Sequence, residues 1–421
     1  MLFGSELLSA PYRKHVLAEN EAGESHKYEG GAVRCVSRVV QMIDQIRERI
    51  RSAYASAIGR NRRELVTPAL ILDLGILRQN LTLMAELMKS KPAKLRAHIK
   101  VHKSPDIAHL QIEAGAIGIG TATIWEALVI ARSGIKDVFV INEVVGPEKI
   151  RTAALLSREV PLKVAVDDTS NVEALSKAAR EAGSEIGCVI EVDTGMRRCG
   201  ISSPEEALSL ARRISELPGV CLDGLSGYEG HCSLEFHKVK REYMARRAMD
   251  YFVGIADQLI RNGFPCPILS AGGTGTWEVT ASNPRITEIQ PGSYAANDGY
   301  HVRLDPRFRQ ATTVLATVIS RRPEHIVTDA GKKTVGGAEA VLVDYDYPIL
   351  RYDEEHGIFS TYGSCPLKVG DAVELFPGYT PFAVSYFDVY HVVQGDKVVD
   401  VWPVLPRGPE HGGLLDTFKD R

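Results

Sequence analysis

Short apolar stretches alternate with amphipathic segments through the middle of the chain, from about Thr67 to Asp298. The stretches have the length and composition of buried strands. We predict these strands at Arg96–Val101, Ala116–Gly120, Val138–Ile141, Leu162–Val166, Cys188–Val192, Leu222–Ser226, Pro267–Ala271 and Thr287–Ile289. Eight strands with helical crossovers indicate a parallel α/β fold, and eight is the number that closes a (β/α)8 TIM barrel.

The segments between these strands repeat their apolar residues at three- and four-residue spacing, which predicts helices. They are Pro105–Ala114, Trp125–Ser133, Pro147–Ser157, Asn171–Ala182, Pro204–Glu216 and Lys240–Arg261. Many of the predicted strands end in a polar or glycine-rich cluster just before the next helix. In a barrel of this kind the carboxyl ends of the strands form the active-site face.

The pattern changes on both sides of this central part. Residues 1–65 form an N-terminal extension that is partly helical, because apolar residues recur at helical spacing between Val36 and Ile58. We interpret this helix as one that packs on a domain or on a partner subunit. After the barrel, predicted at 66–306, residues 307–421 form a smaller β domain. Its predicted strands are Thr312–Ile319, Ala340–Leu342, Ala372–Leu375, Val389–Val393 and Val398–Val404. A further strand-like segment, Thr67–Leu74, is expected to pair with this domain.

Composition narrows the class of protein. The formal net charge of −3 gives no reason to expect a nucleic-acid or membrane partner. No apolar run approaches the roughly 18 residues of a membrane span, and the N-terminus lacks the apolar core of a secretory signal. The seven cysteines are scattered, without a CxxC pair. We therefore expect a reduced, cytoplasmic enzyme.

The segment Arg96–Lys103, RAHIKVHK, carries the first candidate chemistry. Side chains alternate along a strand, so His98, Lys100 and His102 would share a face, directed inward near the barrel mouth. A lysine inside a barrel is costly unless it is neutralised or paired. A Schiff base with a cofactor aldehyde would neutralise it. The alternative is a surface strand with scattered basic residues.

Two loops have the composition of a phosphate site. The stretch Ser270–Thr276, SAGGTGT, follows the seventh strand, and Gln290–Tyr294, QPGSY, follows the eighth. Glycine-rich turns leave backbone N–H groups free to converge on a phosphate. The usual phosphate site of a barrel is built from these two loops, so their joint placement is more specific than either motif alone.

Polar residues also follow the fifth and sixth strands, in Glu191–Gly200, EVDTGMRRCG, and in Gly227–His231, GYEGH. Both segments would present side chains at the same mouth of the barrel. His231 could stack on a flat cofactor ring or move protons. The alternative for His231 is a structural histidine whose hydrogen bonds are satisfied.

Taken together, these motifs resemble the D-threonine aldolase and D-serine dehydratase family, which are fold-type III pyridoxal 5′-phosphate (PLP) enzymes with an alanine racemase-like barrel. Matching segments run collinearly from about Thr67 to Val404. They include TPALILDL, LRAHIKVHKSPDIAHLQ, INEVVGPEKI, EVDTGMRRCGI, GYEGH, AGGTGTW, EIQPGSYAAND, DEEHG and VVDVWPV.

The resemblance implies PLP as cofactor and assigns residues to it. Lys100, rather than Lys103, would carry PLP as a Schiff base, with His98 nearby. Arg198 would lie by the pyridine nitrogen, and an arginine there leaves that nitrogen unprotonated. The remaining cofactor contacts would come from Tyr228, His231, Gly273, Thr274, Gly275, Ser293 and Tyr294. Members of this fold type are usually homodimers, so we expect one here.

The resemblance also implies the reaction. Family members form an external aldimine with a D-β-hydroxy amino acid such as D-threonine or D-serine, and then cleave Cα–Cβ or eliminate water. They use a divalent metal held by a His-x-Cys or His-x-Asp pair in the C-terminal domain. Here the corresponding positions are Tyr379 and Pro381, in FPGYTPFAV. Proline has no ligand atom in its side chain, and tyrosine is a poor substitute for imidazole at neutral pH.

We therefore expect the family's metal site to be absent and no divalent metal as a cofactor. Three hypotheses follow. The first is a PLP lyase of the family type, with Lys100 and His231 as catalytic residues and Tyr379 as an acid or base where relatives hold the metal. The second is a metal-independent racemase or epimerase, or an enzyme of another reaction at Cα. Lys100 and a tyrosine of the C-terminal domain would then lie on opposite faces of the substrate aldimine. The third is a non-catalytic PLP-binding protein.

Overall fold

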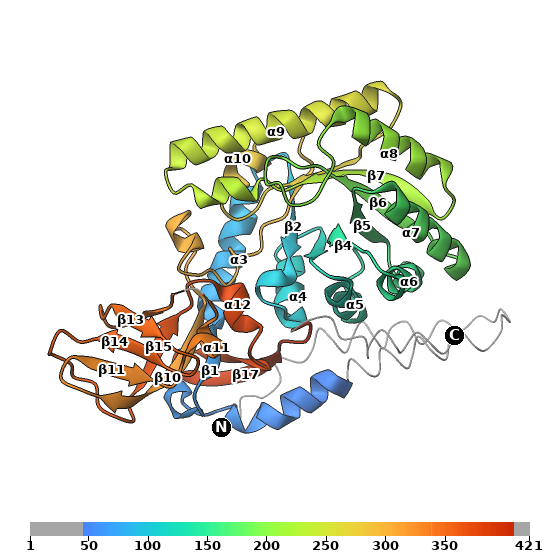
Figure 1. The fold of residues 1–421 in the computed structure, drawn as a ribbon. Helices are drawn as coiled ribbons and strands as arrows, with labels where there is room; N and C mark the ends of the chain where they lie inside the picture. The colour runs from blue at the N-terminus through green and yellow to red at the C-terminus, as the bar shows by residue number, and fades with distance from the viewer. Residues whose placement is uncertain (1–44, 338, 408–421) are drawn as a thin grey trace. The chain divides into compact units, whose positions relative to one another are not determined.

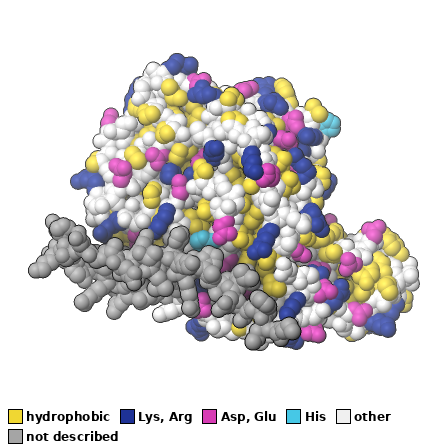
Figure 2. Space-filling view, turned by 180° about the vertical axis from the view of Figure 1, so that it is seen from behind, with side chains coloured by type: hydrophobic (Ala, Val, Ile, Leu, Met, Phe, Trp, Pro, Cys, Tyr) yellow, Lys and Arg dark blue, Asp and Glu magenta, His cyan; other side chains and the backbone are white. Residues whose placement is uncertain are grey.

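The computed structural model describes residues 45–337 and 339–407. The predicted N-terminal helix, Val36–Ile58, lies partly outside this range. Its described part is helical over residues 45–54 and continues into the 3₁₀ turn η1 (Ala55–Ala57). Within the described residues, no helix has both the length and the apolar character needed to cross a membrane. On the face shown in Figure 2, basic and acidic side chains are interspersed.

Eight parallel strands form a closed barrel, which confirms the predicted fold class (Figure 1). These strands are β2 (Lys94–His98), β3 (Gly118–Thr121), β4 (Val138–Glu143), β5 (Leu162–Val166), β6 (Ile186–Glu191), β7 (Val220–Gly227), β8 (Ile268–Ala271) and β9 (Glu288–Ile289). The last strand closes on the first, with Lys94 opposite Glu288 and Leu95 opposite Ile289. Their carboxyl ends therefore meet at one mouth.

The helices of the barrel unit are α3 (Leu74–Met88), α4 (Pro105–Glu113), α5 (Ile124–Arg132), α6 (Pro147–Leu156), α7 (Thr169–Ala182), α8 (Pro204–Glu216), α9 (Lys238–Arg261) and α10 (Trp277–Ala281). Side-chain caps fix several of their starts. Thr123 accepts the N–H of Glu126 at the start of α5, and Ser203 accepts that of Glu206 at the start of α8. Such caps satisfy N–H groups that have no partner within the helix.

The described residues also form a nine-stranded sheet that is separate from the barrel. It comprises β1 (Ala69–Asp73), β10 (Thr312–Arg321), β11 (His325–Thr328), β12 (Val341–Leu342), β13 (Ile349–Tyr352), β14 (Gly357–Ser360), β15 (Ala372–Phe376), β16 (Val389–Gln394) and β17 (Lys397–Pro403). The short helices α11 (Lys332–Val335) and α12 (Thr380–Val384) accompany it. β1, which precedes the barrel in the chain, pairs antiparallel with β10 and parallel with β16 (Figure 1).

One predicted strand is shorter than its apolar pattern suggests. The strand expected at Arg96–Val101 ends at His98, and Ile99–Val101 form a 3₁₀ turn, η3. The His98 ring accepts the N–H of Lys100, which turns the backbone away from the strand. The prediction that His98, Lys100 and His102 share one face of a strand was therefore wrong. Lys100 lies on a turn at the carboxyl end of β2, and His102 is buried with its ring 3.1 Å from the amide of Gln111.

Candidate active site at the mouth of the barrel

Lys100 presents a desolvated amine at the barrel mouth. Its Nζ lies 5.6 Å from the ring centroid of Tyr228. Among the residues that the structure describes, no acceptor or carboxylate is paired with this nitrogen. Burial lowers the pKa of Lys100, and the positive charge of Arg198 lowers it further. A lysine that loses its proton readily can act as a nucleophile toward a carbonyl group.

The neighbouring Lys103 is held quite differently. Its Nζ pairs with the buried carboxylate of Glu126 and also donates to the carbonyl of Pro406, at 3.0 Å. Its backbone has φ +50°, so it leaves η3 in the left-handed region. An amine held by a carboxylate and a carbonyl oxygen is already occupied by these partners, so it is poorly placed to attack a carbonyl group. The geometry therefore distinguishes the two lysines, because Lys103 is paired with Glu126 and the Lys100 amine has no such partner.

Tyr228 lies between two cationic side chains. The guanidinium carbon of Arg198 is 5.9 Å from its ring centroid, on a loop that follows β6. Arg198 is also 3.7 Å from the carboxylate of Glu191, the last residue of β6. Burial, then Glu229 and Tyr379, raise the pKa of Tyr228 to about 12, so the phenol keeps its proton. Lys100, Tyr228 and Arg198 thus lie within reach of one small group.

His231 lies against the turn that follows β6. A side chain at Gly195 would place its Cβ only 3.1 Å from the imidazole, and Gly195 has φ +114°, so this position suits glycine. The Nε2 atom is 3.5 Å from the Cys232 sulfur, whereas Nδ1 is buried without a hydrogen-bond partner. An unpartnered buried nitrogen is uncommon, and a ligand would satisfy it.

The two predicted phosphate loops adjoin each other. The backbone N–H of Tyr294 donates to the hydroxyl of Thr274, at 3.2 Å. A Cβ on Gly273 would meet the ring of Tyr228 at 2.8 Å, and one on Gly275 would meet Ser233 at 2.5 Å, so both glycines permit close approach. The Ser233 hydroxyl is buried without a partner. Free donors beside glycine backbone are what a phosphate group requires.

Within the second phosphate loop, Ser293 and Tyr294 are both buried. The Tyr294 hydroxyl accepts a hydrogen bond from Gln111, and its ring packs edge-on against Phe308. Burial raises the pKa of this phenol well above its ordinary value. The Tyr294 side chain is thus held by packing and by its hydrogen bond to Gln111. Only the backbone of Tyr294 is available to the site.

Glu229 joins the GYEGH segment to the SAGGTGT segment, and it was not among the predicted site residues. It is fully buried, and its carboxylate accepts the N–H of Gly272 at 3.1 Å and the hydroxyl of Thr280 at 2.6 Å. It therefore fixes the loop that carries His231 against the phosphate loop. An acidic residue between two glycines in GYEGH was the available signal, because a charge there requires fixed partners when buried.

Tyr379 lies at the start of α12 in the C-terminal domain. Its ring stacks on that of His301, with centroids 6.1 Å apart, and the His301 Nδ1 atom lies 2.9 Å from Asp298. Burial, followed by the charge of Asp298, raises the pKa of Tyr379. Pro381 occupies the first turn of α12, where it has no ligand atom to offer. A metal held by residues at these two positions does not fit this chain.

Comparisons with known proteins identify the family of this chain. Residues 72–296 match the family model described as "Alanine racemase, N-terminal domain", and residues 311–393 match "Putative serine dehydratase domain". D-threonine aldolase from Arthrobacter sp is 34% identical over 351 residues, covering 81% of this chain and 93% of that protein. 3-Hydroxy-D-aspartate aldolase from Paracoccus denitrificans (strain Pd 1222) is 33% identical over 83% of this chain and 94% of its own.

A solved structure extends the agreement to three dimensions. The crystal structure of D-threonine aldolase from Filomicrobium marinum superposes with a TM-score of 0.80 at 32% identity. The match covers 83% of this chain and 98% of that one, so it includes both the barrel and the sheet domain. This chain belongs to the family of PLP-dependent D-threonine aldolases and their dehydratase relatives, built on the alanine racemase-type barrel.

Proposed function

We propose that this chain is a PLP-dependent lyase that acts on a D-β-hydroxy amino acid, cleaving Cα–Cβ as the two aldolase relatives do. The observation that carries the proposal is the unpaired, desolvated amine of Lys100 at the barrel mouth, beside Tyr228 and Arg198. The unpartnered polar atoms of His231 and Ser233 support a ligand at the same mouth.

The residues suit PLP. Lys100 would hold it covalently, and Gly273, Thr274, Gly275 and Ser293 would hold its phosphate. Tyr228 would lie against the ring, Arg198 would bind the pyridine nitrogen, and His98 would support the Lys100 turn through its hydrogen bond. When bound, PLP supplies an electron-withdrawing ring that stabilises negative charge at Cα.

We assign the proton transfers to two side chains. His231 has a free Nδ1 atom and could accept the proton of the substrate hydroxyl. Tyr379 keeps its own proton because its pKa is raised, so it suits the role of hydrogen-bond donor or acid rather than base. An arginine beside the pyridine nitrogen would donate a hydrogen bond to it and would leave it unprotonated, which would limit how much charge the ring can accept.

We propose that the family's C-terminal metal site is absent from this chain, because Tyr379 and Pro381 stand at its ligand positions. Tyr379 would then orient the substrate hydroxyl, which is the role of the metal in relatives. We also propose that the protein is a cytoplasmic homodimer, which size-exclusion chromatography with light scattering would test.

A racemase remains the second candidate, because Lys100 and Tyr379 are each in a state suited to moving a Cα proton. One incubation separates the candidates: purified holoenzyme with D- and L-threonine, serine and alanine in deuterated water. Glycine and an aldehyde from the D-isomer alone support the aldolase, and a keto acid indicates a dehydratase. Deuterium at Cα with loss of optical purity and no cleavage would replace the proposal with a racemase. An unchanged PLP absorption spectrum with every amino acid would indicate a non-catalytic binding protein.

A further inference from the structure

Three neighbouring barrel strands lead into carboxylates that the proposed reaction does not use. Successive side chains of a strand point to opposite faces. One set of alternate residues on β4, β5 and β6 forms a separate apolar cluster: Phe139, Ile141, Ala165 and Val189. The other set, including Val140, packs in the main core with the helices. Two residues beyond the apolar cluster on each strand come Glu143, Asp167 and Glu191. These three carboxylates therefore continue the inward-facing rows above an apolar layer.

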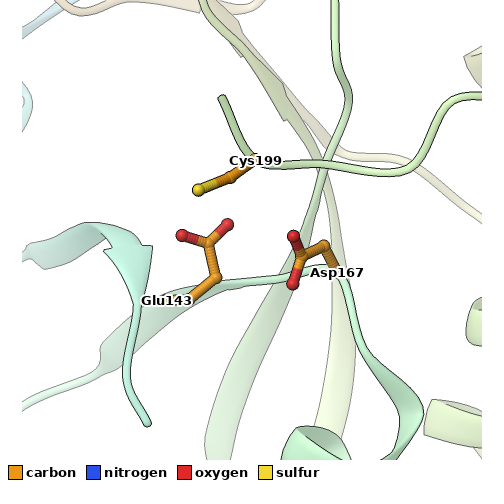
Figure 3. Close-up of side chains that lie close together, drawn as sticks. All are labelled: Glu143, Asp167 and Cys199. Atoms are coloured by element: carbon orange, nitrogen blue, oxygen red, sulfur yellow. The ribbon is translucent and has the colours of Figure 1, made fainter. Parts of the chain in front are cut away.

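A thiol from the next loop completes the group. Cys199 follows Arg198 in the segment after β6, and a bridge between Val192 and Ile201 returns this segment to the barrel. Three side chains each offer one ligand atom here, and these three atoms lie within 4.8 Å of one another: Glu143, Asp167 and Cys199 (Figure 3). Oxygen and sulfur ligands bind zinc at about 2.0–2.3 Å. Rotamer adjustments of about 1 Å would bring these atoms to that distance from a common centre.

A second observation points to a ligand beside these side chains. Glu191 is only 5% exposed, and its Oε2 atom has no hydrogen-bond partner. The Oε1 atom of Glu143 is likewise buried without a partner. Arg198 supplies a single positive charge, 3.7 Å from Glu191. Buried charges are normally paired or bound to a metal.

We propose that Glu143, Asp167 and Cys199 bind a divalent cation of borderline softness, such as Zn²⁺, with Glu191 beside it as a further oxygen ligand. Two or three carboxylates with one thiolate form a donor set that suits Zn²⁺ better than Mg²⁺ or Ca²⁺. The site lies on β4, β5 and the loop after β6, so it is separate from the C-terminal position that Tyr379 and Pro381 occupy. Because Cys199 is adjacent to Arg198 in the chain, the cation would hold Arg198 in place.

The test uses chelator-treated holoenzyme, kept reduced, and titrates it with Cd²⁺ and with Zn²⁺. We expect one tight site per chain and an ultraviolet thiolate-to-Cd²⁺ charge-transfer band. Cys199→Ser should remove this band and weaken Cd²⁺ binding by about 10- to 100-fold. Glu143→Gln should weaken binding by about tenfold but keep the band, because the thiol remains. Circular dichroism establishes that each variant is folded.

Cys266→Ser is the matched control, since Cys266 precedes β8 and lies at the opposite end of that strand from the site. It should bind Cd²⁺ like the unmodified protein. The proposal is overturned if no saturable site is found, or if Cys199→Ser binds as tightly as Cys266→Ser. Binding to Cys199→Ser that is as tight as to the unmodified protein would instead place the cation at another site, including the C-terminal one. Because the readout is metal binding, these results do not depend on whether the chain is a lyase.

Discussion

The two sides of the candidate active site differ in how they relate to the family pattern. On the barrel side, Lys100, Tyr228 and the glycine-rich loops lie together, with an unpaired amine and unpartnered polar atoms facing the mouth. On the C-terminal side, Tyr379 and Pro381 stand at the positions where the resemblance to the family places a metal-ligand pair. The residues proposed to hold the cofactor and those proposed to determine the reaction therefore belong to separate parts of the chain. The sequence of one part can change while the other part is retained.

The sharpest test of the barrel side is Lys100→Ala. Without its amine the protein should lose covalent PLP, and activity on D-threonine should fall by more than about 10³-fold. Borohydride reduction followed by peptide mapping should place the PLP of the unmodified protein on Lys100. Covalent PLP that persists in Lys100→Ala would break the comparison, because the cofactor would then be held elsewhere.

Lys103→Ala is the matched change on the neighbouring lysine. It leaves the buried carboxylate of Glu126 without its partner, which should lower the free energy of unfolding by about 3 kcal/mol. Covalent PLP should be retained, because Lys103 is committed to an ion pair. Denaturant unfolding and the PLP absorption band measure the two effects, and loss of the cofactor from a folded Lys103→Ala protein would exchange the roles given to the two lysines.

On the C-terminal side, Tyr379→Phe removes the phenol but keeps the ring on His301. We expect PLP binding to be unchanged and kcat to fall by about 10²-fold, the usual effect of removing a general acid. Steady-state kinetics measures kcat, and a PLP titration of the same variant measures cofactor binding. Wild-type kcat in this variant would show that the C-terminal tyrosine has no chemical part in the reaction.

The mildest change is Arg198→Gln, tested by pH. The charge of Arg198 lowers the pKa of Lys100, so removing it should raise that pKa. Lys100 reacts as the neutral amine, and the pH profile of PLP binding to the apoprotein should therefore shift to higher pH. Stopped-flow absorbance across a pH series measures the shift. An unshifted profile would mean that burial alone sets the state of Lys100.

The sequence predicted the barrel well because its strands are buried on both faces and appear as short apolar runs, such as Leu162–Val166, which has those bounds in the structure. It failed at Ile99–Val101, where a hydrogen bond from the Lys100 backbone to His98 produces a turn that apolar periodicity cannot reveal. β11, β13 and β14 were also missed. In β13 the residues are exposed or half-buried, so the apolar signal was weak.

The same limit applies to the site. The motifs selected Lys100, Tyr228 and the two glycine-rich loops as candidates, since glycine patterns and strand ends are visible in one dimension. The link from Glu229 to Gly272 and Thr280 joins segments about forty to fifty residues apart, and the carboxylates of β4, β5 and β6 meet only after the barrel closes. Neither can be read from local spacing, because each depends on which strands become neighbours.

The position of β1 makes the sheet domain discontinuous in sequence. Leu70 and Leu72 are fully buried in a strand that pairs with β10 and β16, yet this strand precedes the whole barrel. A fragment cut between the barrel and the later strands would leave an apolar strand without its partners, which favours aggregation. The two domains therefore cannot be exchanged as modules by a single crossover, and a functional chimera would have to carry residues 69–73 together with the C-terminal sheet domain.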